Sequence, residues 1–161
     1  MTIPFTLEAP MRALLTALLL LPAAVHAQQR PPVQAEYLTS PATTSQNLPF
    51  SEAVRVGDML YLSGQIGLKP GTREVVSGGL AAEAKQTMDN IRAVLERHGS
   101  SLRRVVKCTV FMADMKEWPD FNGIYVTYFD RDRLPARSAF GANGLALGAR
   151  VEVECLALAG K

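Results

Sequence analysis

Two ionisable residues near the end of the chain, Arg137 and Glu152, have the types and spacing to act together on a small acid. The guanidinium fork of an arginine binds a carboxylate through two parallel hydrogen bonds, and a nearby glutamate can take a proton from water or from a substrate. The pair therefore predicts a site in which Arg137 holds a carboxylate and Glu152 handles water. The alternative is that Arg137 pairs with an acidic neighbour and Glu152 faces solvent, as most strand charges do.

The segments that carry these two residues have the patterns of β-strands. Residues 150–157 alternate between apolar and polar types, which is the period of a strand with one buried face, and Glu152 lies opposite that face. The stretch 141–148 contains several glycines and can reverse the chain. We therefore expect the strand with Arg137 to lie beside the strand with Glu152, so that both side chains meet in one cleft.

Three more strands and two helices are expected to position these segments. The strands are predicted at 53–56, 59–64 and 106–112, and the helices at 80–95 and from Pro119 to Phe129. The element order is then strand, strand, helix, strand, helix, strand, strand. This order predicts an α+β fold, an open sheet with both helices packed on one face.

The opposite face of the sheet would then be bare. It combines Phe111, Tyr61, Leu156 and Leu158 with polar residues. Half-apolar exposed faces mark interaction sites, and clefts between subunits often hold ligands. The pattern predicts a closed homo-oligomer that buries this face and carries its sites between subunits.

The first residues differ in composition from the rest. Residues 1–27 combine a basic residue, a short apolar run and small residues before Ala27, which is the pattern of a secretory signal peptide. The run is short for a membrane span, although an uncleaved anchor is the alternative. Cleavage predicts a periplasmic or secreted protein without stable membrane insertion. Residues 28–48 are rich in Pro, Gln, Ser and Thr, which predicts a flexible leader, and a single domain is expected at 49–161.

Composition excludes several kinds of chemistry. The formal net charge of +2 over 161 residues, without a basic stripe, favours no nucleic-acid partner. His98 is the only histidine after the predicted signal peptide, so a histidine triad and a His-rich zinc site are not expected, and we predict no metal. Cys108 and Cys155 lie in phase with valines and are interpreted as unpaired buried residues, although an exported chain could bridge them.

Ordered motifs from about Pro49 to Leu158 resemble the RidA/YjgF family of reactive-intermediate imine deaminases. The matching segments are Ser63-Gly64-Gln65-Ile66, Gly78-Gly79 with the 86–95 helix, 105–111, Asn122 with Tyr125, Pro135-Ala136-Arg137-Ser138 and Val151-Glu152-Val153-Glu154. The resemblance implies a chorismate-mutase-like α+β fold and a homotrimer with three clefts between subunits, without a cofactor.

The resemblance also implies an activity, the hydrolysis of enamines and imines such as 2-aminoacrylate and 2-imino acids to 2-keto acids and ammonia. Arg137 would then anchor the substrate carboxylate and Glu152 would orient or deprotonate the attacking water. By the same resemblance, Ser63, Gly64 and Asn122 would line the cleft and bind the substrate.

Two substrate-binding positions depart from the family pattern. Phe50 stands where the family often has Tyr, followed by Glu52 in place of Gln, and Ala139 stands where many members have a reactive Cys. The missing tyrosine hydroxyl can change substrate preference, and a thiol is not needed in this mechanism. The alternative function is a non-catalytic trimeric binding protein for small keto or carboxylic acids or for a protein partner. Ribonuclease activity, the third reading, has no support in charge or in a histidine pair.

Overall fold

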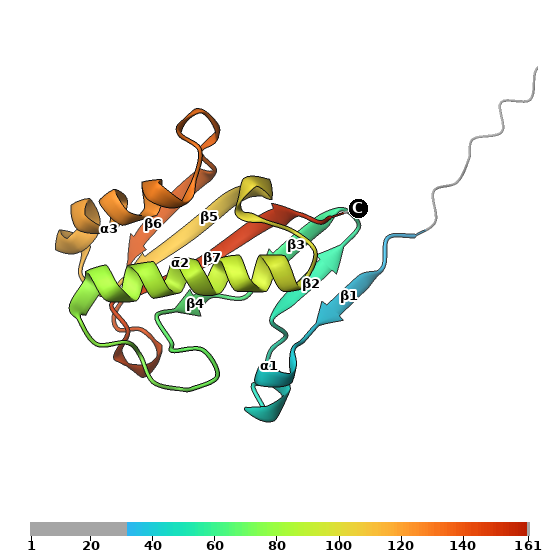
Figure 1. Cartoon of the computed structure of the whole chain (residues 1–161), viewed down its shortest axis with the longest axis horizontal. Helices are drawn as coiled ribbons and strands as arrows, with labels where there is room; N and C mark the ends of the chain where they lie inside the picture. The colour runs from blue at the N-terminus through green and yellow to red at the C-terminus, as the bar shows by residue number, and fades with distance from the viewer. Residues whose placement is uncertain (1–31, 161) are drawn as a thin grey trace, which may run out of the picture. The chain divides into compact units, whose positions relative to one another are not determined.

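A mixed sheet of seven strands runs through the part of the chain that this computed structural model describes, residues 32–160 (Figure 1). The predicted signal peptide at 1–27 lies outside the described residues. The strands are β1 (Ala35–Leu38), β2 (Ala53–Val56), β3 (Met59–Leu62), β4 (Gln65–Ile66), β5 (Val105–Met112), β6 (Ala136–Gly141) and β7 (Val151–Leu158). The helices are α1 (Pro41–Ser45), α2 (Gly79–Arg97) and α3 (Trp118–Tyr125), with short 3-10 turns between elements.

The strand order is β1-β2-β3-β7-β5-β6, with β4 also paired to β7. All pairs are antiparallel except β5 and β6, which are parallel and joined through α3. The prediction that the strand of Arg137 lies beside the strand of Glu152 is wrong. Strand β7 pairs with β5 on one edge and with β3 and β4 on the other, so it has no free edge for β6. The connection from β6 to β7 instead passes the C-terminal end of β5, where Ala142 N donates to Met112 O.

Helices α2 and α3 cover one face of the sheet, as expected (Figure 1). Leu80, Ala84, Met88, Ile91 and Leu95 recur at helical spacing on α2 and are all buried. They share the core with the apolar side of β7, which Val151, Val153, Cys155 and Ala157 form. On α3, Phe121 and Tyr125 are buried.

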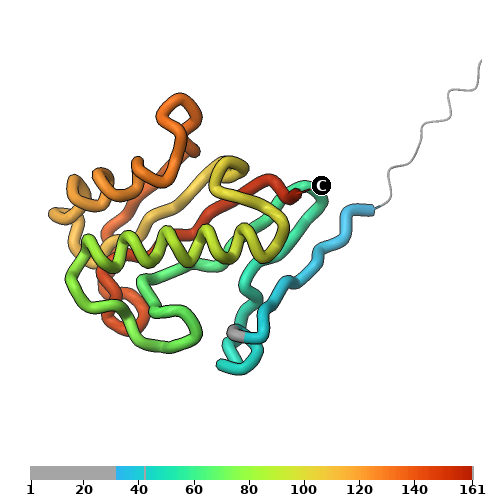
Figure 2. The backbone as a smooth tube through the Cα atoms, in the orientation of Figure 1, coloured from blue at the N-terminus to red at the C-terminus, as the bar shows by residue number. Residues whose placement is uncertain are grey.

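The predicted flexible leader at 28–48 gives way to regular structure from Ala35 onwards. Strand β1 pairs with β2 from Ala35↔Val56 to Leu38↔Ala53, and the chain turns back on itself through α1 (Figure 2). Ser40 caps α1, because its Oγ accepts from Thr43 N while Thr43 Oγ1 accepts from Ser40 N. The polar composition that suggested disorder belongs to an exposed edge strand and a helix cap.

The face of the sheet opposite α2 and α3 is partly apolar, as the sequence predicted. Tyr61, Phe140 and Leu158 are 45%, 54% and 40% exposed on it. The rings of Phe111 and Phe140 stack at a centroid distance of 6.3 Å. Polar residues such as Thr109 share this face, so it combines apolar contact area with hydrogen-bonding groups.

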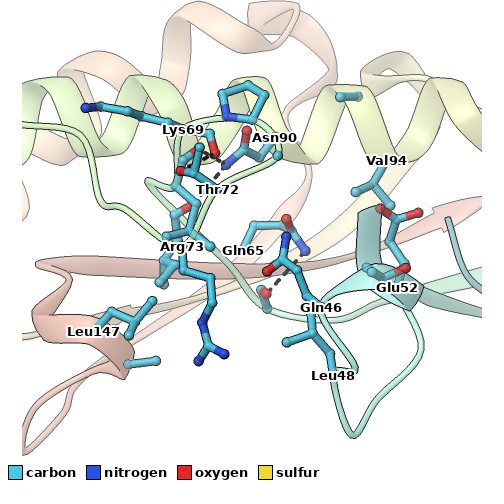
Figure 3. A pocket seen from close by; sticks show the side chains of 18 of the residues that line it. Gln46, Leu48, Glu52, Gln65, Lys69, Thr72, Arg73, Asn90, Val94 and Leu147 are labelled. Carbon is cyan, nitrogen blue, oxygen red and sulfur yellow. Dashed lines mark hydrogen bonds between the residues drawn. The ribbon is translucent and has the colours of Figure 1, made fainter. Parts of the chain in front are cut away.

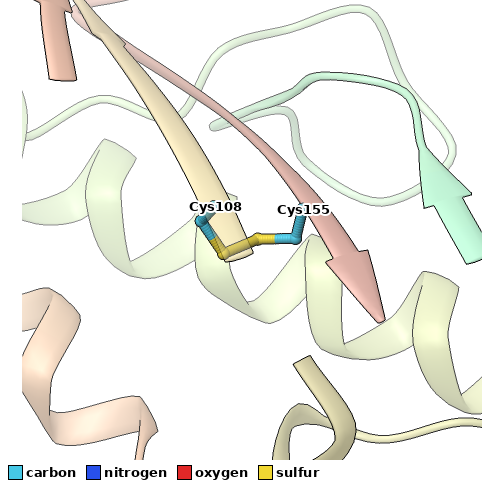
Figure 4. Close-up of a disulfide and its surroundings, with 2 residues drawn as sticks. All are labelled: Cys108 and Cys155. Carbon is cyan, nitrogen blue, oxygen red and sulfur yellow. A yellow bond between two sulfur atoms is a disulfide. The ribbon is translucent and has the colours of Figure 1, made fainter. Parts of the chain in front are cut away.

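Cys108 and Cys155 form a disulfide between β5 and β7, so their interpretation as unpaired residues is wrong (Figure 4). They are direct partners in the strand register, with their Cα atoms 4.1 Å apart, and both face the buried side. Each cysteine was correctly placed on a strand. Only the register of two strands far apart in the sequence brings them opposite each other.

Candidate active site

Three side chains of α3 hold the guanidinium of Arg137. Arg137 Nη2 donates to Asn122 Oδ1 at 2.7 Å, and the guanidinium carbon lies 4.5 Å from the ring centroids of both Trp118 and Tyr125. Among residues 32–160, Arg137 forms no ion pair with an acidic neighbour, which was the alternative to a ligand role. An arginine has five N–H donors, so most remain free for a carboxylate. We call these three residues the arginine clamp.

Tyr125 contributes its ring to this clamp without contributing a charge. Burial raises the pKa of Tyr125 to about 12, and the positive charge of Arg137 opposes this rise only in part. The phenol is therefore neutral at physiological pH. Its hydroxyl is buried and has no hydrogen-bond partner among the described residues, so the ring face is what Tyr125 offers to the guanidinium.

Glu152 lies on the other side of the sheet from the helices, because it alternates along β7 with the buried Val151 and Val153. Burial, and then the charge of Glu154, raises the pKa of the Glu152 carboxyl above its ordinary value. A Cβ atom on residue 64 would overlap this carboxylate where it lies, so a larger residue there would displace the Glu152 side chain. The structure thus brings together two of the predicted site residues, Gly64 and Glu152.

Gly64, Glu152 and Phe50 line a pocket of about 450 Å³ (Figure 3). Its walls come from the α1–β2 connection, the 64–73 segment, one side of α2 and the 146–147 turn. The apolar walls include Leu48, Phe50, Leu68, Val94 and Leu147, and the charged residues are Glu52, Lys69, Arg73, Arg97 and Glu152. A small acid with an apolar body fits such a lining.

The predicted site residues fall into two separate groups in one chain. Arg137 is the register partner of Cys108 on the buried side of β5, whereas Glu152 is the partner of Phe111 on the opposite side. The two side chains therefore point away from opposite faces of the sheet, with β5 between their strands. The expectation that one chain brings them into one cleft is wrong, because the sheet order places β6 at the edge.

The remaining predicted residues divide in the same way. Asn122 belongs to the arginine clamp, and Ala139 packs against the core from the same side of β6. Ser63 Oγ donates to the backbone carbonyl of Ser51 at 2.7 Å, so in this structure its hydroxyl ties the end of β3 to β2. Phe50 is 52% exposed at the pocket.

A buried carboxylate beside the pocket was missed from the sequence. Glu52 accepts hydrogen bonds from Ser40 Oγ at 3.3 Å and from Arg97, and His98 Nε2 lies 2.9 Å from its other oxygen. The cluster joins the cap of α1, the start of β2 and the end of α2. The signal that could have found it is the acidic residue where the family has Gln, which requires partners once it is buried.

The roles of Trp118 and Tyr125 in the arginine clamp were also missed. Phe121 on the same helix is fully buried and belongs to the core. Trp118 and Tyr125 are seven residues apart and so lie on the same side of α3, from which both rings reach one guanidinium. That spacing is visible in the sequence, whereas the position of Arg137 against it is not.

The Endoribonuclease L-PSP family model matches residues 41–159. The chain belongs to this family. It is the RidA/YjgF family that the motifs indicated, since solved members carry those names. The 2-iminobutanoate/2-iminopropanoate deaminase of Mus musculus is 44% identical over 112 residues, which cover 70% of this chain and 82% of the mouse protein. The human protein of the same name is 42% identical over 112 residues, 70% of this chain and 81% of that protein.

Solved structures agree with the α+β YjgF fold. RidA from the Antarctic bacterium Psychrobacter sp. PAMC 21119 is 32% identical with a TM-score of 0.66, over 80% of this chain and 99% of that one. The YjgF gene product of E. coli is 34% identical with a TM-score of 0.63, over 68% and 87% of the two chains. Within residues 32–160, none of the helices has the length and apolarity to span a membrane.

Proposed function

We propose that this protein hydrolyses 2-imino acids and their enamine tautomers, such as 2-aminoacrylate, to 2-keto acids and ammonia. The observation that carries the proposal is the Glu152 carboxylate, held against Gly64 in a pocket, in a chain 44% identical to a protein named as such a deaminase. A carboxyl whose pKa is raised towards neutrality is a better general base than an ordinary glutamate.

The proposed reaction uses two side chains. The free donors of Arg137 bind the substrate carboxylate, and Glu152 accepts a proton from the water that attacks the imine carbon. The C–O bond forms as the C=N π bond breaks. Glu152 then returns this proton to nitrogen, which gives a carbinolamine. As the C–N bond breaks, the hydroxyl oxygen becomes the keto group and its proton passes through Glu152 to the departing nitrogen, which leaves as ammonia. One water is consumed, and no oxidant or cofactor is required.

A second copy of the chain is needed to complete this site, because Arg137 and Glu152 point from opposite faces of the sheet. We propose a homotrimer in which the arginine clamp of one subunit faces the pocket of its neighbour. The exposed rings of Tyr61 and Phe140 on the helix-free face supply apolar area for the contact.

Charge placed in that contact, as in Phe140→Asp, should give monomers in sedimentation velocity and abolish turnover, whereas Val33→Asp outside the sheet should do neither. A Phe140→Asp monomer with full activity would refute the shared site.

We further propose that the protein works in the periplasm or outside the cell. The apolar run within 1–27 motivates this proposal, and the disulfide between Cys108 and Cys155 supports it, because such bonds persist in oxidising compartments. Imino acids released by amino-acid oxidation outside the cytoplasm would then be its substrates. Detection of the protein only in the cytoplasmic fraction of its source cell, with its cysteines reduced, would refute this localisation.

The activity is tested with 2-imino acids generated in situ by an amino-acid oxidase and mixed with the 28–161 protein. We expect faster release of keto acid and ammonia than in buffer. Arg137→Ala should lower kcat/KM by about 100-fold, mainly through KM, because it removes charged hydrogen bonds to the substrate. Glu152→Gln should lower kcat by about 100-fold or more, because it removes the base.

The exposed variant Glu96→Gln serves as the control and should keep wild-type rates. A wild-type protein that accelerates nothing, yet binds keto acids in an Arg137-dependent way, would be a ligand-binding protein and not an enzyme.

A further inference from the structure

The pocket beside Glu152 is larger than the smallest imino acids require. Its volume of about 450 Å³ lies within the range of about 300–1,000 Å³ that encloses drug-sized ligands. Beyond Gly64 and Glu152 the walls are largely apolar, with Leu48, Phe50 and Leu147 among them. A substrate held at Glu152 can therefore place several methylene groups along these walls.

Three cationic side chains line the same pocket, and two of them are already paired. Lys69 forms an ion pair with Glu74, and Arg97 forms one with the buried Glu52. Within residues 32–160, Arg73 has no carboxylate partner. In Figure 3 its side chain extends from the 67–73 loop into the space between Leu147 and Leu48, which line the pocket with it.

The loop that carries Arg73 is held in place on α2. Asn90 Nδ2 donates to the backbone carbonyls of Ile66 and Leu68, both at 3.0 Å. The loop also closes as a small hairpin, with Lys69 N donating to Glu74 O at 2.9 Å and Val76 N donating to Gly67 O at 2.8 Å. The backbone that presents Arg73 is therefore tied to the helix and not only to the loop itself.

We propose that Arg73 binds a second carboxylate and selects dicarboxylic 2-imino acids, such as the imine of glutamate. The inference rests on the proposed function. Arg137 holds the carboxylate next to the imine, the apolar walls accept the methylene groups, and Arg73 at the pocket binds the distal carboxylate through its fork. Arg73 is then a specificity-determining residue for the reaction.

The size of the effect follows from the exposure of Arg73. A charge-assisted hydrogen bond to an exposed guanidinium is weaker than a buried one, so its loss should change discrimination by about tenfold. The contact is remote from the reacting carbon and is made equally in the ground state and the transition state. Its loss should therefore raise KM for the dicarboxylic substrate while kcat stays close to the wild-type value.

The test compares kcat/KM for the imine of glutamate with kcat/KM for the imine of 2-aminobutanoate, both made in situ. In Arg73→Gln the ratio of the first to the second should fall about tenfold, and in Arg73→Glu it should fall further, because a like charge then faces the distal carboxylate. Arg103→Gln, which removes an exposed arginine outside this pocket, should leave the ratio at the wild-type value. An unchanged ratio in Arg73→Gln would overturn the proposal.

Failure of the inference and failure of the proposed function give different results. If the wild-type protein hydrolyses the 2-aminobutanoate imine but not the glutamate imine, the function stands and the Arg73 proposal is wrong. If it hydrolyses neither imine, the proposed function is wrong. Calorimetry with 2-oxoglutarate, on the wild type and on Arg73→Gln, then tests the second-carboxylate site by itself. Binding that weakens about tenfold in Arg73→Gln supports the second-carboxylate site, and equal binding, or none, overturns it.

Discussion

At the scale of single residues, Glu152 combines a glycine contact with an unfavourable electrostatic environment. Burial and the neighbouring Glu154 both disfavour its ionised form, so its carboxyl keeps a proton to higher pH than an ordinary glutamate. Such a residue weakens the fold at neutral pH, and in the proposed reaction it acts as the base. Two measurements can separate these consequences.

The first residue-scale prediction concerns the pH dependence of turnover. If ionised Glu152 is the base, kcat/KM should fall as the pH falls through its raised pKa. Glu154→Gln removes the neighbouring negative charge, so it should lower the pKa of Glu152 and shift the acid limb of the pH profile to lower pH. The profile of Glu96→Gln should coincide with the wild type. An acid limb that stays in place in Glu154→Gln would show that another group controls it.

The second residue-scale prediction concerns stability. A carboxyl whose pKa is raised on folding contributes stability that is fully present below its unfolded pKa and is lost as the pH rises through its folded pKa. Glu152→Gln avoids this loss, so its Tm should exceed that of the wild type at pH 7 and approach it at about pH 3. A lower Tm for Glu152→Gln at pH 7, measured by calorimetry, would contradict this prediction.

At the scale of elements, α3 does the positioning for Arg137. Trp118, Asn122 and Tyr125 present two ring faces and one amide oxygen to the same guanidinium, and they come from two turns of one short helix. An unclamped arginine side chain has considerable rotamer freedom, which substrate binding would have to restrict. In the proposed site, the helix therefore orders Arg137 before a substrate carboxylate binds.

The element-scale prediction uses two substitutions at Asn122. Asn122→Ala removes the hydrogen bond and should raise KM several-fold, with a limited change in kcat. Asn122→Asp keeps the shape but places a carboxylate beside Arg137, which then competes with the substrate carboxylate, so its KM should rise about tenfold more. Both variants should melt within a few degrees of the wild type. Equal KM values for the two variants would refute the competition.

At the scale of the whole molecule, the disulfide joins two neighbouring strands of the sheet, β5 and β7. Cys108 and Cys155 are 47 residues apart, and their bond shortens the unfolded chain across α3, β6 and the loops that connect them. Closing a loop of this length is expected to stabilise the fold by up to about 4 kcal/mol through the unfolded state. The bond thus matters for stability wherever the protein meets oxidising conditions.

The whole-molecule prediction compares the oxidised and reduced proteins. Reduction should lower the free energy of unfolding by about 2–4 kcal/mol in guanidinium titrations, and the double variant Cys108→Val with Cys155→Ala should be insensitive to the reductant. Thiol alkylation followed by mass spectrometry reports whether the bond is present before each titration. Equal stability with and without the bond would contradict the expected role.

Several features of this protein could be predicted from local sequence alone. The helical spacing of Leu80 to Leu95, the strand alternation around Glu152 and the half-apolar face with Phe111 and Tyr61 all appear in the structure. The side of a strand on which Glu152 lies depends only on its immediate neighbours, so a period of two was enough. The family followed from motifs in order along the chain, and its model matches residues 41–159.

Other features were decided only by the tertiary structure. Whether Arg137 lies beside Glu152, and whether Cys108 meets Cys155, depends on which strands are neighbours and in which register, and composition and spacing do not determine this. Strand β1 was missed because an exposed edge strand lacks a buried face. The sequence by itself determined the family, helices α2 and α3, and the side of β7 on which Glu152 lies, because these depend on residues close together in the chain. Tertiary structure decided that one chain holds the two halves of the candidate site apart, because strand order depends on how the whole sheet packs.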